Sequence, residues 1–223
     1  MKFVNFAKYE DLNRVASART AHFAYADRLR ARGELAVGGP LLDGDGQRIG
    51  LLFIYEAPSR DVALGFVRDD PFTSAKALSR YVVTEWRLRG ANVGLLAKAN
   101  RSADHTGGAP PQVRLFANYT KYSGDVSRLE HVRPAHWQYD HALKRDGKQA
   151  LAGPCADNSG GLFVYSATSA GEAISHANND PFVLEGVVAG SELHEWLIEG
   201  VNTDLLTSDF PPGKQDLPVD STG

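Results

Sequence analysis

The chain has 223 residues, 43% of them hydrophobic and 23% charged, which allows one large domain or two small ones, each with a buried core. A formal net charge of −3 offers no basic field for nucleic acid, and the single cysteine, Cys155, excludes an intrachain disulfide. The sequence shows neither an apolar signal segment nor a stretch of membrane-spanning length, so we expect a cytoplasmic protein that does not contact a membrane.

The first part of the chain predicts six elements. In order, these are a strand at 3–8, a helix with His22, Tyr25 and Leu29 at helical spacing that ends at Gly33, strands at 34–41 and 50–57, a helix after Ser59, and a strand around Trp86. The order β-α-β-β-α-β is that of the ferredoxin-like fold. Residues 1–97 therefore predict one ferredoxin-like α+β unit.

The same series of elements returns in the second part of the chain. The stretch "RTAHFAYADRL" beginning at Arg19 matches "RPAHWQYDHAL" beginning at Arg133, and "TEWRLRGANVGLL" from Thr84 matches "HEWLIEGVNTDLL" from His194. Because many such matches follow one another in the same order, the chain is a tandem duplication. Residues 114–207 predict the second repeat, 98–113 an exposed linker and 208–223 a mobile tail.

Each repeat alone would leave one face of its sheet uncovered. The other repeat can cover that face, so we expect the two sheets to pack against each other as an intrachain pseudo-dimer. The fused chain can then be a monomer, although its outer faces leave further self-association open. We expect Trp86 and Trp196, at matching positions in the last strands, to pack in the barrel or between the halves.

Polar residues recur at matching positions of the two repeats. These are Arg19 and Arg133, His22 and His136, Tyr25 and Tyr139, and Asp70 and Asp180, the last two within Asp-Pro-Phe. By contrast, Asp69 is replaced by Asn179 and Glu56 by Ser166. The repeated retention of polar types at these positions favours a functional site in each repeat.

The motifs together resemble the YCII-related (YciI-like) domain family, a branch of the dimeric α+β barrel proteins. The resemblance rests on Arg-x-x-His, Gly-Pro before a hairpin, Asp-Pro-Phe after the second helix, and a tryptophan in the last strand, over residues 3–96 and 115–206. It implies a barrel usually formed by two identical chains, here by one. One branch of the family implies a dehydrochlorinase for chlorinated hydroxyquinols, with a His–Asp dyad that corresponds here to His22 with Asp70 and His136 with Asp180.

The residue types suit acid–base chemistry. We place His22 and His136 in the first turns of their helices, with Pro134 at the helix start; there the helix terminus disfavours an imidazolium, and the aspartate favours it. Arg19 and Arg133 would hold an anionic substrate oxygen, and Tyr25 and Tyr139 would donate phenol hydrogen bonds. The chemistry would be that of a lyase, isomerase or dehydrochlorinase.

Two other interpretations remain open. The same cavities could bind a small anionic or aromatic ligand without catalysis. Alternatively, the histidines could be hydrogen-bonded core residues, the aspartates turn caps, and Arg-x-x-His a structural clasp. No cofactor and no metal is expected, because His131, His136 and His141 would point in different directions around a helix. Cys155 reads as an inert buried thiol.

Overall fold

The structure, a computed structural model, describes residues 1–101 and 113–207. The first half contains β1 (Lys2–Tyr9), α1 (Leu12–Ala31), β2 (Leu35–Leu42), β3 (Arg48–Glu56), α2 (Arg60–Arg68), α3 (Pro71–Ser74) and β4 (Leu78–Trp86). The second half contains β6 (Leu115–Tyr122), α5 (Val126–Arg145), β7 (Gln149–Pro154), β8 (Gly160–Ser166), α6 (Ala170–Asn178), α7 (Pro181–Leu184) and β9 (Val188–Trp196). Short elements follow each half: β5 (Gly90–Ala91), α4 (Val93–Ala99) and the 3₁₀-helix η1 (Thr203–Leu205).

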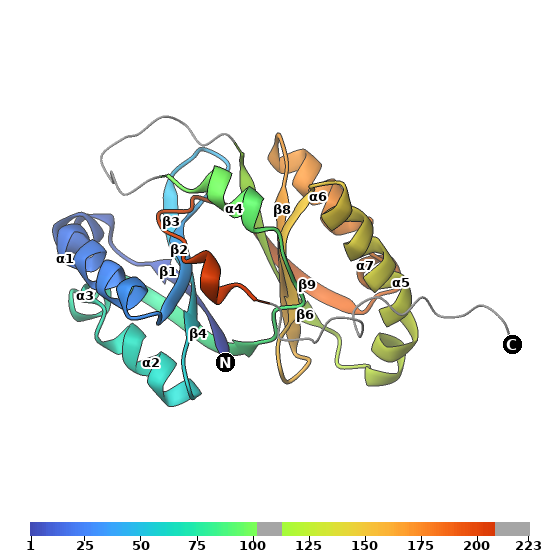
Figure 1. Ribbon diagram of the computed structural model, residues 1–223, viewed down its shortest axis with the longest axis horizontal. Coiled ribbons are helices and arrows are strands. Elements are labelled where there is room, and N and C mark those ends of the chain that lie inside the picture. Colours follow the sequence, from blue (N-terminus) through green and yellow to red (C-terminus); the bar gives the residue numbers. More distant parts are fainter. Residues whose placement is uncertain (102–112, 208–223) are drawn as a thin grey trace, which may run out of the picture.

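The two halves have the predicted ferredoxin-like topology. Strand order is β4-β1-β3-β2 in the first half and β9-β6-β8-β7 in the second, with antiparallel pairing throughout. Figure 1 shows the strands in the middle of the molecule, with α1, α2 and α3 covering the outer face of one sheet and α5, α6 and α7 that of the other. The predicted α+β pseudo-dimer within one chain is confirmed.

Alternation along the strands explains this layering. In β1, the side chains of Val4 and Phe6 belong to the core between the two sheets, whereas Phe3 and Ala7 pack toward the helices. Both faces of these strands are apolar because both are covered, and successive side chains of a strand point to opposite faces. The inner core also takes residues from the second half, including Leu115 and Ala117. One continuous core therefore joins the halves.

The halves are also joined by backbone hydrogen bonds at their edges. The backbone N–H of Arg87, just beyond β4, donates to Pro154 O at 3.0 Å, and that of Leu197, just beyond β9, donates to Pro40 O at 3.0 Å. A Cβ at Gly39 would lie 1.8 Å from Leu197 O. Glycine is required there, because only a residue without a side chain allows the opposite strand to approach so closely. Each half thus completes the sheet edge of the other.

Trp86 and Trp196 contribute side-chain hydrogen bonds at the two edges where the halves join. Both are 1% exposed and belong to the inner core. The indole Nε1 of Trp86 donates to Gly153 O at 2.7 Å, and that of Trp196 donates to Gly39 O at 3.2 Å. Each tryptophan therefore reaches from its own half into the Gly-Pro segment of the other, as expected for a residue at the interface between halves.

The predicted linker at 98–113 begins later than expected, and the predicted tail at 208–223 lies outside the described residues. The chain does not become a linker at residue 98, because Lys98 and Ala99 end helix α4, and Asn100 forms a parallel bridge with Ile198. The rest of the predicted linker, apart from residues 101 and 113, and the predicted tail at 208–223 lie outside the described residues. Among the described helices, none combines the length and apolar character that crossing a membrane requires.

Candidate functional site

The first repeat brings His22 and Asp70 together. His22 lies on α1, and its Nδ1 is 2.8 Å from Asp70 Oδ1 and 3.0 Å from Oδ2. Asp70 caps the short helix α3, where its Oδ1 also accepts the backbone N–H of Phe72 at 2.8 Å. Because a carboxylate can only accept, Nδ1 carries the proton and Nε2 is the basic nitrogen. The pair is buried: His22 is 4% and Asp70 3% exposed.

The Asp-Pro-Phe motif acquires a specific structural meaning here. Asp70 fixes the imidazole, Pro71 begins α3 at a position where no backbone N–H is needed, and Phe72 covers the ring. The rings of His22 and Phe72 stack with centroids 3.8 Å apart and an interplanar angle of 13°. The motif is thus more than a turn, because all three residues hold one imidazole in a defined orientation.

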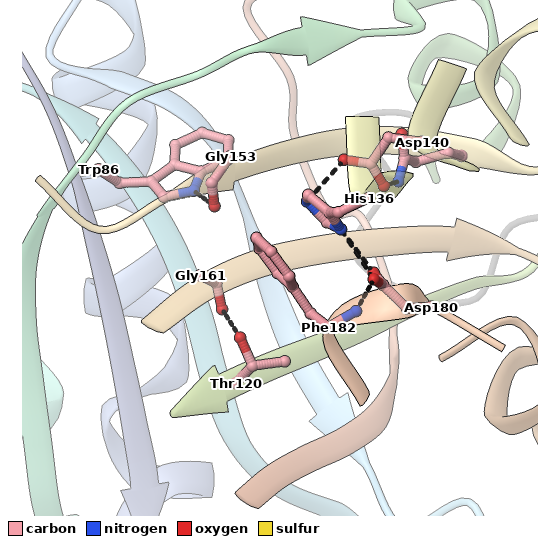
Figure 2. A network of polar contacts seen from close by, with 9 residues as sticks. Trp86, Thr120, His136, Asp140, Gly153, Gly161, Asp180 and Phe182 are labelled. Carbon is pink, nitrogen blue, oxygen red and sulfur yellow. Dashed lines mark hydrogen bonds and ion pairs between the residues drawn. The ribbon is translucent and has the colours of Figure 1, made fainter. Parts of the chain in front are cut away.

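The second repeat builds the same pair and adds a third group. His136 Nδ1 lies 2.8 Å from Asp180 Oδ1, and the ring stacks on Phe182 at 3.9 Å. Its other nitrogen, Nε2, lies 3.3 Å from Asp140 Oδ2, so the imidazole sits between two carboxylates (Figure 2). Asp140 in turn accepts a hydrogen bond from Gln149 Nε2 at 2.8 Å. No nitrogen of His136 is left for a ligand.

The helix positions of both histidines differ from the prediction. α1 begins at Leu12 with Asp11 as N-cap, and α5 begins at Val126 with Asp125 as N-cap. His22 and His136 are therefore each ten residues past the first helical residue, in the middle of their helices, and Pro134 lies inside α5. The helix N-terminus is too far away to act on either imidazole, since its field acts only over the first turn.

A narrow cavity adjoins the first dyad. It has a volume of about 20 Å³, room for about one water molecule, and His22, Arg19, Tyr9 and Arg48 contribute to its lining. The Nε2 of His22 and the guanidinium of Arg19 have no hydrogen-bond or ion-pair partner within residues 1–101 and 113–207. Arg48 pairs with Glu199 of the second half at 2.7 Å. The site therefore combines an unpaired cation with a basic ring nitrogen.

The corresponding arginine of the second repeat is already paired. Arg133 Nη2 donates to Glu130 Oε1 at 2.5 Å, and Nε donates to Oε2 at 3.1 Å. The residue of the first repeat that matches Glu130 is Ala16, which has no charge. A single replacement in the same helix thus decides whether this arginine is available.

Electrostatics separate the two histidines further. Burial opposes protonation of His136, but the charges of Asp140 and Asp180 outweigh it and raise the pKa of the imidazole. Burial also raises the pKa of Asp140, and Asp180 adds to this, while His136 opposes it. The second repeat therefore places the imidazole between two carboxyl groups that favour its protonated form, an arrangement that suits a buried polar network better than a general base.

Tyr25 and Tyr139 were expected to donate hydrogen bonds at the dyads, but their hydroxyl groups bond elsewhere. The hydroxyl of Tyr25 donates to Phe66 O at 2.9 Å, and that of Tyr139 donates to His176 O at 2.8 Å. Each thus connects the long helix to the second helix of its own repeat. Burial raises the pKa of both phenols to about 12. Both hydroxyl groups donate to backbone carbonyls within the fold, so neither phenol is available as a donor at the dyads.

The described residues contain one set that could hold a metal ion: His136, Asp140 and Asp180, whose potential ligand atoms lie within 4.8 Å of one another. The two carboxylates contact different nitrogens of the ring, Asp180 the Nδ1 and Asp140 the Nε2. A metal ion bound to one ring nitrogen would be close to only one of the two carboxylates, because the other lies on the opposite side of the ring. The arrangement is therefore one of hydrogen bonds. Cys155 is buried, and burial raises its pKa to about 11, so the thiol is protonated.

Sequence reasoning missed Asp140, Arg48 and Glu199. A signal for Asp140 was present, because the repeat alignment places it opposite Ala26, and places its partner Gln149 opposite Leu35. Two polar residues at core positions of one copy indicate a buried pair. Arg48 and Glu199 carried no comparable signal, since their contact depends on how the second half closes over the first.

The Asp140–Gln149 pair gives a double-mutant test. Asp140→Ala alone is expected to cost about 1–3 kcal/mol of unfolding free energy, because buried Gln149 loses its acceptor. The double change Asp140→Ala with Gln149→Leu copies Ala26 and Leu35 of the first repeat and is expected to recover most of that loss. Urea denaturation of the wild type, both single variants and the double variant measures the coupling. Additive effects of the two changes would show that the pair does not act as a unit.

Comparisons with known proteins agree with the architecture. A family model for the YCII-related domain matches residues 1–87 and 114–197. No curated protein matches the sequence. A solved 5-chloro-2-hydroxyhydroquinone dehydrochlorinase from Burkholderia phenoliruptrix AC1100, in complex with 2,5-dihydroxybenzoquinone, is 33% identical, with a TM-score of 0.37; the match covers 40% of this chain and 96% of that one.

Longer structures resemble the whole chain. A heme-binding protein from Thermus thermophilus is 13% identical with a TM-score of 0.53, covering 87% of this chain and 90% of that one. A chlorite dismutase from Candidatus Nitrospira defluvii is 12% identical with a TM-score of 0.53, covering 92% and 93%. At this level of identity the likeness concerns the fold alone, which is that of the dimeric α+β barrels.

Proposed function

The chain belongs to the YCII-related domain family, with one domain in each half, and we propose that its first repeat is a small-molecule enzyme in which His22 and Asp70 form an acid–base dyad. The observation that carries the proposal is the state of the imidazole. Asp70 holds Nδ1 at 2.8 Å, while Nε2 has no partner in the described parts of the chain and His22 lines a cavity. A fixed ring with one available nitrogen is what a general base requires.

The neighbouring groups fit a proton transfer that creates negative charge on oxygen. Nε2 of His22 would take a proton from the substrate, and Asp70 would stabilise the imidazolium that results. Arg19, which lines the same cavity, would hold the developing oxyanion. If the substrate is a chlorinated hydroquinol, His22 would first move a hydroxyl proton to the carbon that bears chlorine, which gives the keto form. It would then take a second hydroxyl proton while the C–Cl bond breaks and the electron pair of that bond leaves with chloride, so that a quinone, a chloride ion and one proton released to water result. These groups supply the chemistry of a lyase, isomerase or dehydrochlorinase without an organic cofactor.

The size of the cavity limits how a substrate can bind. A space of about 20 Å³ accepts one small group, such as a hydroxyl or a water molecule. Asp27 and Arg30 line both this cavity and a surface groove of about 430 Å³ beside residues 201–203. We place the reacting hydroxyl in the cavity and the rest of a small, hydroxylated aromatic molecule in the groove.

Turnover of a panel of chlorinated and unchlorinated hydroquinols tests the proposal. 5-Chloro-2-hydroxyhydroquinone comes first, because a dehydrochlorinase similar to one repeat acts on it. Chloride release and product formation are followed by ion chromatography and liquid chromatography. Activity should disappear in His22→Gln and persist in His136→Gln, with the melting temperature of each variant as a control for folding. Activity that survives His22→Gln would exclude this dyad.

A structural role is the second candidate, and the small volume of the cavity favours it. If the dyads act only as clasps, His22→Gln should lower the melting temperature by several degrees. No compound of the panel should then be converted or bound by the wild type. In that case both histidines serve to dock Asp-Pro-Phe onto the long helices.

A further inference from the structure

The cavity beside the first dyad is also lined by a phenol that the dyad does not use, that of Tyr9. Tyr9 is the last residue of β1, and it lines the cavity together with Arg19 and His22. Along β1, Phe3 and Ala7 pack toward the helices, and Tyr9 follows the same alternation and packs against the same cluster. The strand thus brings a third polar side chain to the site.

Aromatic packing fixes this phenol relative to the imidazole. The ring of Tyr9 meets that of Phe72 edge to face, with centroids 5.8 Å apart and an interplanar angle of 82°. Phe72 in turn stacks on His22 at 3.8 Å. The Asp-Pro-Phe motif that covers the imidazole therefore also positions Tyr9. A donor held in place before the substrate arrives needs no reorganisation during the reaction.

The hydroxyl group of Tyr9 is available as a donor. Within residues 1–101 and 113–207 it has no hydrogen-bond partner, whereas the hydroxyl group of Tyr25 donates to Phe66 O. The phenol donor that the sequence led us to expect at Tyr25 can therefore come from Tyr9, which belongs to a strand and not to the long helix.

The surroundings of Tyr9 keep its proton in place. Burial raises the pKa of the phenol, and the charges of Glu199 and Asp70 add to this effect, while those of Arg48 and Arg19 oppose it. Because burial outweighs the two arginines, the phenol stays protonated at neutral pH. It can donate a hydrogen bond but does not compete with the imidazole as a base.

The size of the cavity decides what these groups can share. Its volume of about 20 Å³ has room for about one water molecule or one hydroxyl group. The Nε2 of His22 and the hydroxyl group of Tyr9 are both without a partner in the described ranges. Since polar groups that are largely buried are usually satisfied by water or by a ligand, the arrangement favours one oxygen atom at this place.

We propose that Tyr9 is a catalytic residue of the first repeat, whose hydroxyl group donates a hydrogen bond to the substrate oxygen from which His22 removes the proton. This inference rests on the proposed function of His22 and Asp70. Tyr9 keeps its own proton, and its hydrogen bond strengthens as negative charge develops on the oxygen. It therefore stabilises the transition state more than the bound substrate, alongside the positive charge of Arg19.

Tyr9→Phe removes the donor and keeps the ring that packs on Phe72. With a panel compound that the wild type converts, we expect kcat to fall about a hundredfold, as for the loss of one oxyanion donor, and KM to change by less than about threefold. The melting temperature should stay the same, because the hydroxyl group has no partner in the described fold. Tyr122→Phe is the matched control, since Tyr122 meets Phe182 edge to face at 5.5 Å beside the second dyad, and it should leave kcat unchanged.

Isothermal titration calorimetry with 2,5-dihydroxybenzoquinone, the ligand of the similar dehydrochlorinase, adds a measurement that needs no turnover. Tyr9→Phe should raise Kd about tenfold and Tyr122→Phe should not, because only the first phenol would donate to a ligand oxygen.

The two measurements separate this proposal from the proposed function. If His22→Gln abolishes turnover but Tyr9→Phe, folded by melting temperature, keeps the kcat and Kd of the wild type, the role of Tyr9 is overturned and the dyad stands. If Tyr9→Phe abolishes turnover and His22→Gln does not, the dyad is wrong and Tyr9 is supported. If the wild type converts no compound, binding decides: a higher Kd in Tyr9→Phe alone supports the phenol as the donor, whereas equal values or no binding overturn it.

Discussion

Replacing Trp86 or Trp196 by alanine is expected to lower the free energy of unfolding by about 3–5 kcal/mol. Each ring is 1% exposed, and its removal leaves a cavity in the core shared by the halves. Each indole also donates to a glycine carbonyl of the other half, so the change weakens the edge at which the two sheets join. Urea denaturation followed by circular dichroism gives the difference in stability.

Two controls separate the contributions. Trp86→Phe keeps an aromatic ring but loses the donor to Gly153 O, and it is expected to cost about 1–2 kcal/mol. Trp137→Ala makes the same chemical change as Trp86→Ala at a half-buried position, and a loss of about 1 kcal/mol is expected there. A loss below about 1 kcal/mol for Trp86→Ala would mean that the ring does not fasten the halves.

Substituting Asp70 by asparagine is expected to lower kcat at the first repeat by about a hundredfold to ten-thousandfold, while Asp180→Asn leaves it within about twofold. The reason lies in the cap of α3. The Phe72 N–H donates to Oδ1 at 2.8 Å and will keep the amide oxygen of asparagine at that place. The amide nitrogen then takes the place of Oδ2, 3.0 Å from His22 Nδ1, where its N–H group opposes the N–H of the ring and favours the tautomer with the proton on Nε2.

The proton of the imidazole moves as a result. If Nδ1 accepts from asparagine, Nε2 carries the hydrogen and cannot act as a base. Asparagine preserves the cap, so the melting temperature should change little, and a large fall in kcat would report on the tautomer. The change is assayed with whichever panel compound the wild type converts. An unchanged kcat would contradict a role for Asp70 in positioning the base.

The repeat pattern was sufficient to predict the architecture, because every element of one half has a counterpart at a matching position in the other. It also brought His22 to Asp70 and His136 to Asp180, since residues kept as a set at matching positions have a common partner. The helix starts were wrong. Each first turn has only two apolar residues, Leu12 and Val15 in α1 and Val126 and Leu129 in α5. These are too few to establish a helical period, so Asp11 and Asp125 did not stand out as N-caps.

Contacts between the halves were beyond the reach of the sequence. Glu199 reaches Arg48 only because the chain beyond β9 pairs with β2, and Arg89 reaches Trp137 only because the chain beyond β4 pairs with β7. These distances depend on the register of two strand edges, which no local pattern encodes. The sequence does indicate that the two sites differ, because Asp140 and Glu130 of the second repeat match alanines in the first. What each carboxylate does, however, depends on which atom it contacts, and this the sequence does not give.

Reciprocal closure of the two sheet edges has an evolutionary consequence. When two identical chains form such a barrel, one codon specifies both copies of every wall, and a change that improves one cleft is imposed on the other. Here residues 89 and 199 occupy matching positions of the two repeats but are encoded separately, as arginine and glutamate. Joining the two copies in one chain has released the two His–Asp sites from symmetry, so a single polypeptide can acquire two unlike sites while the scaffold between them stays the same.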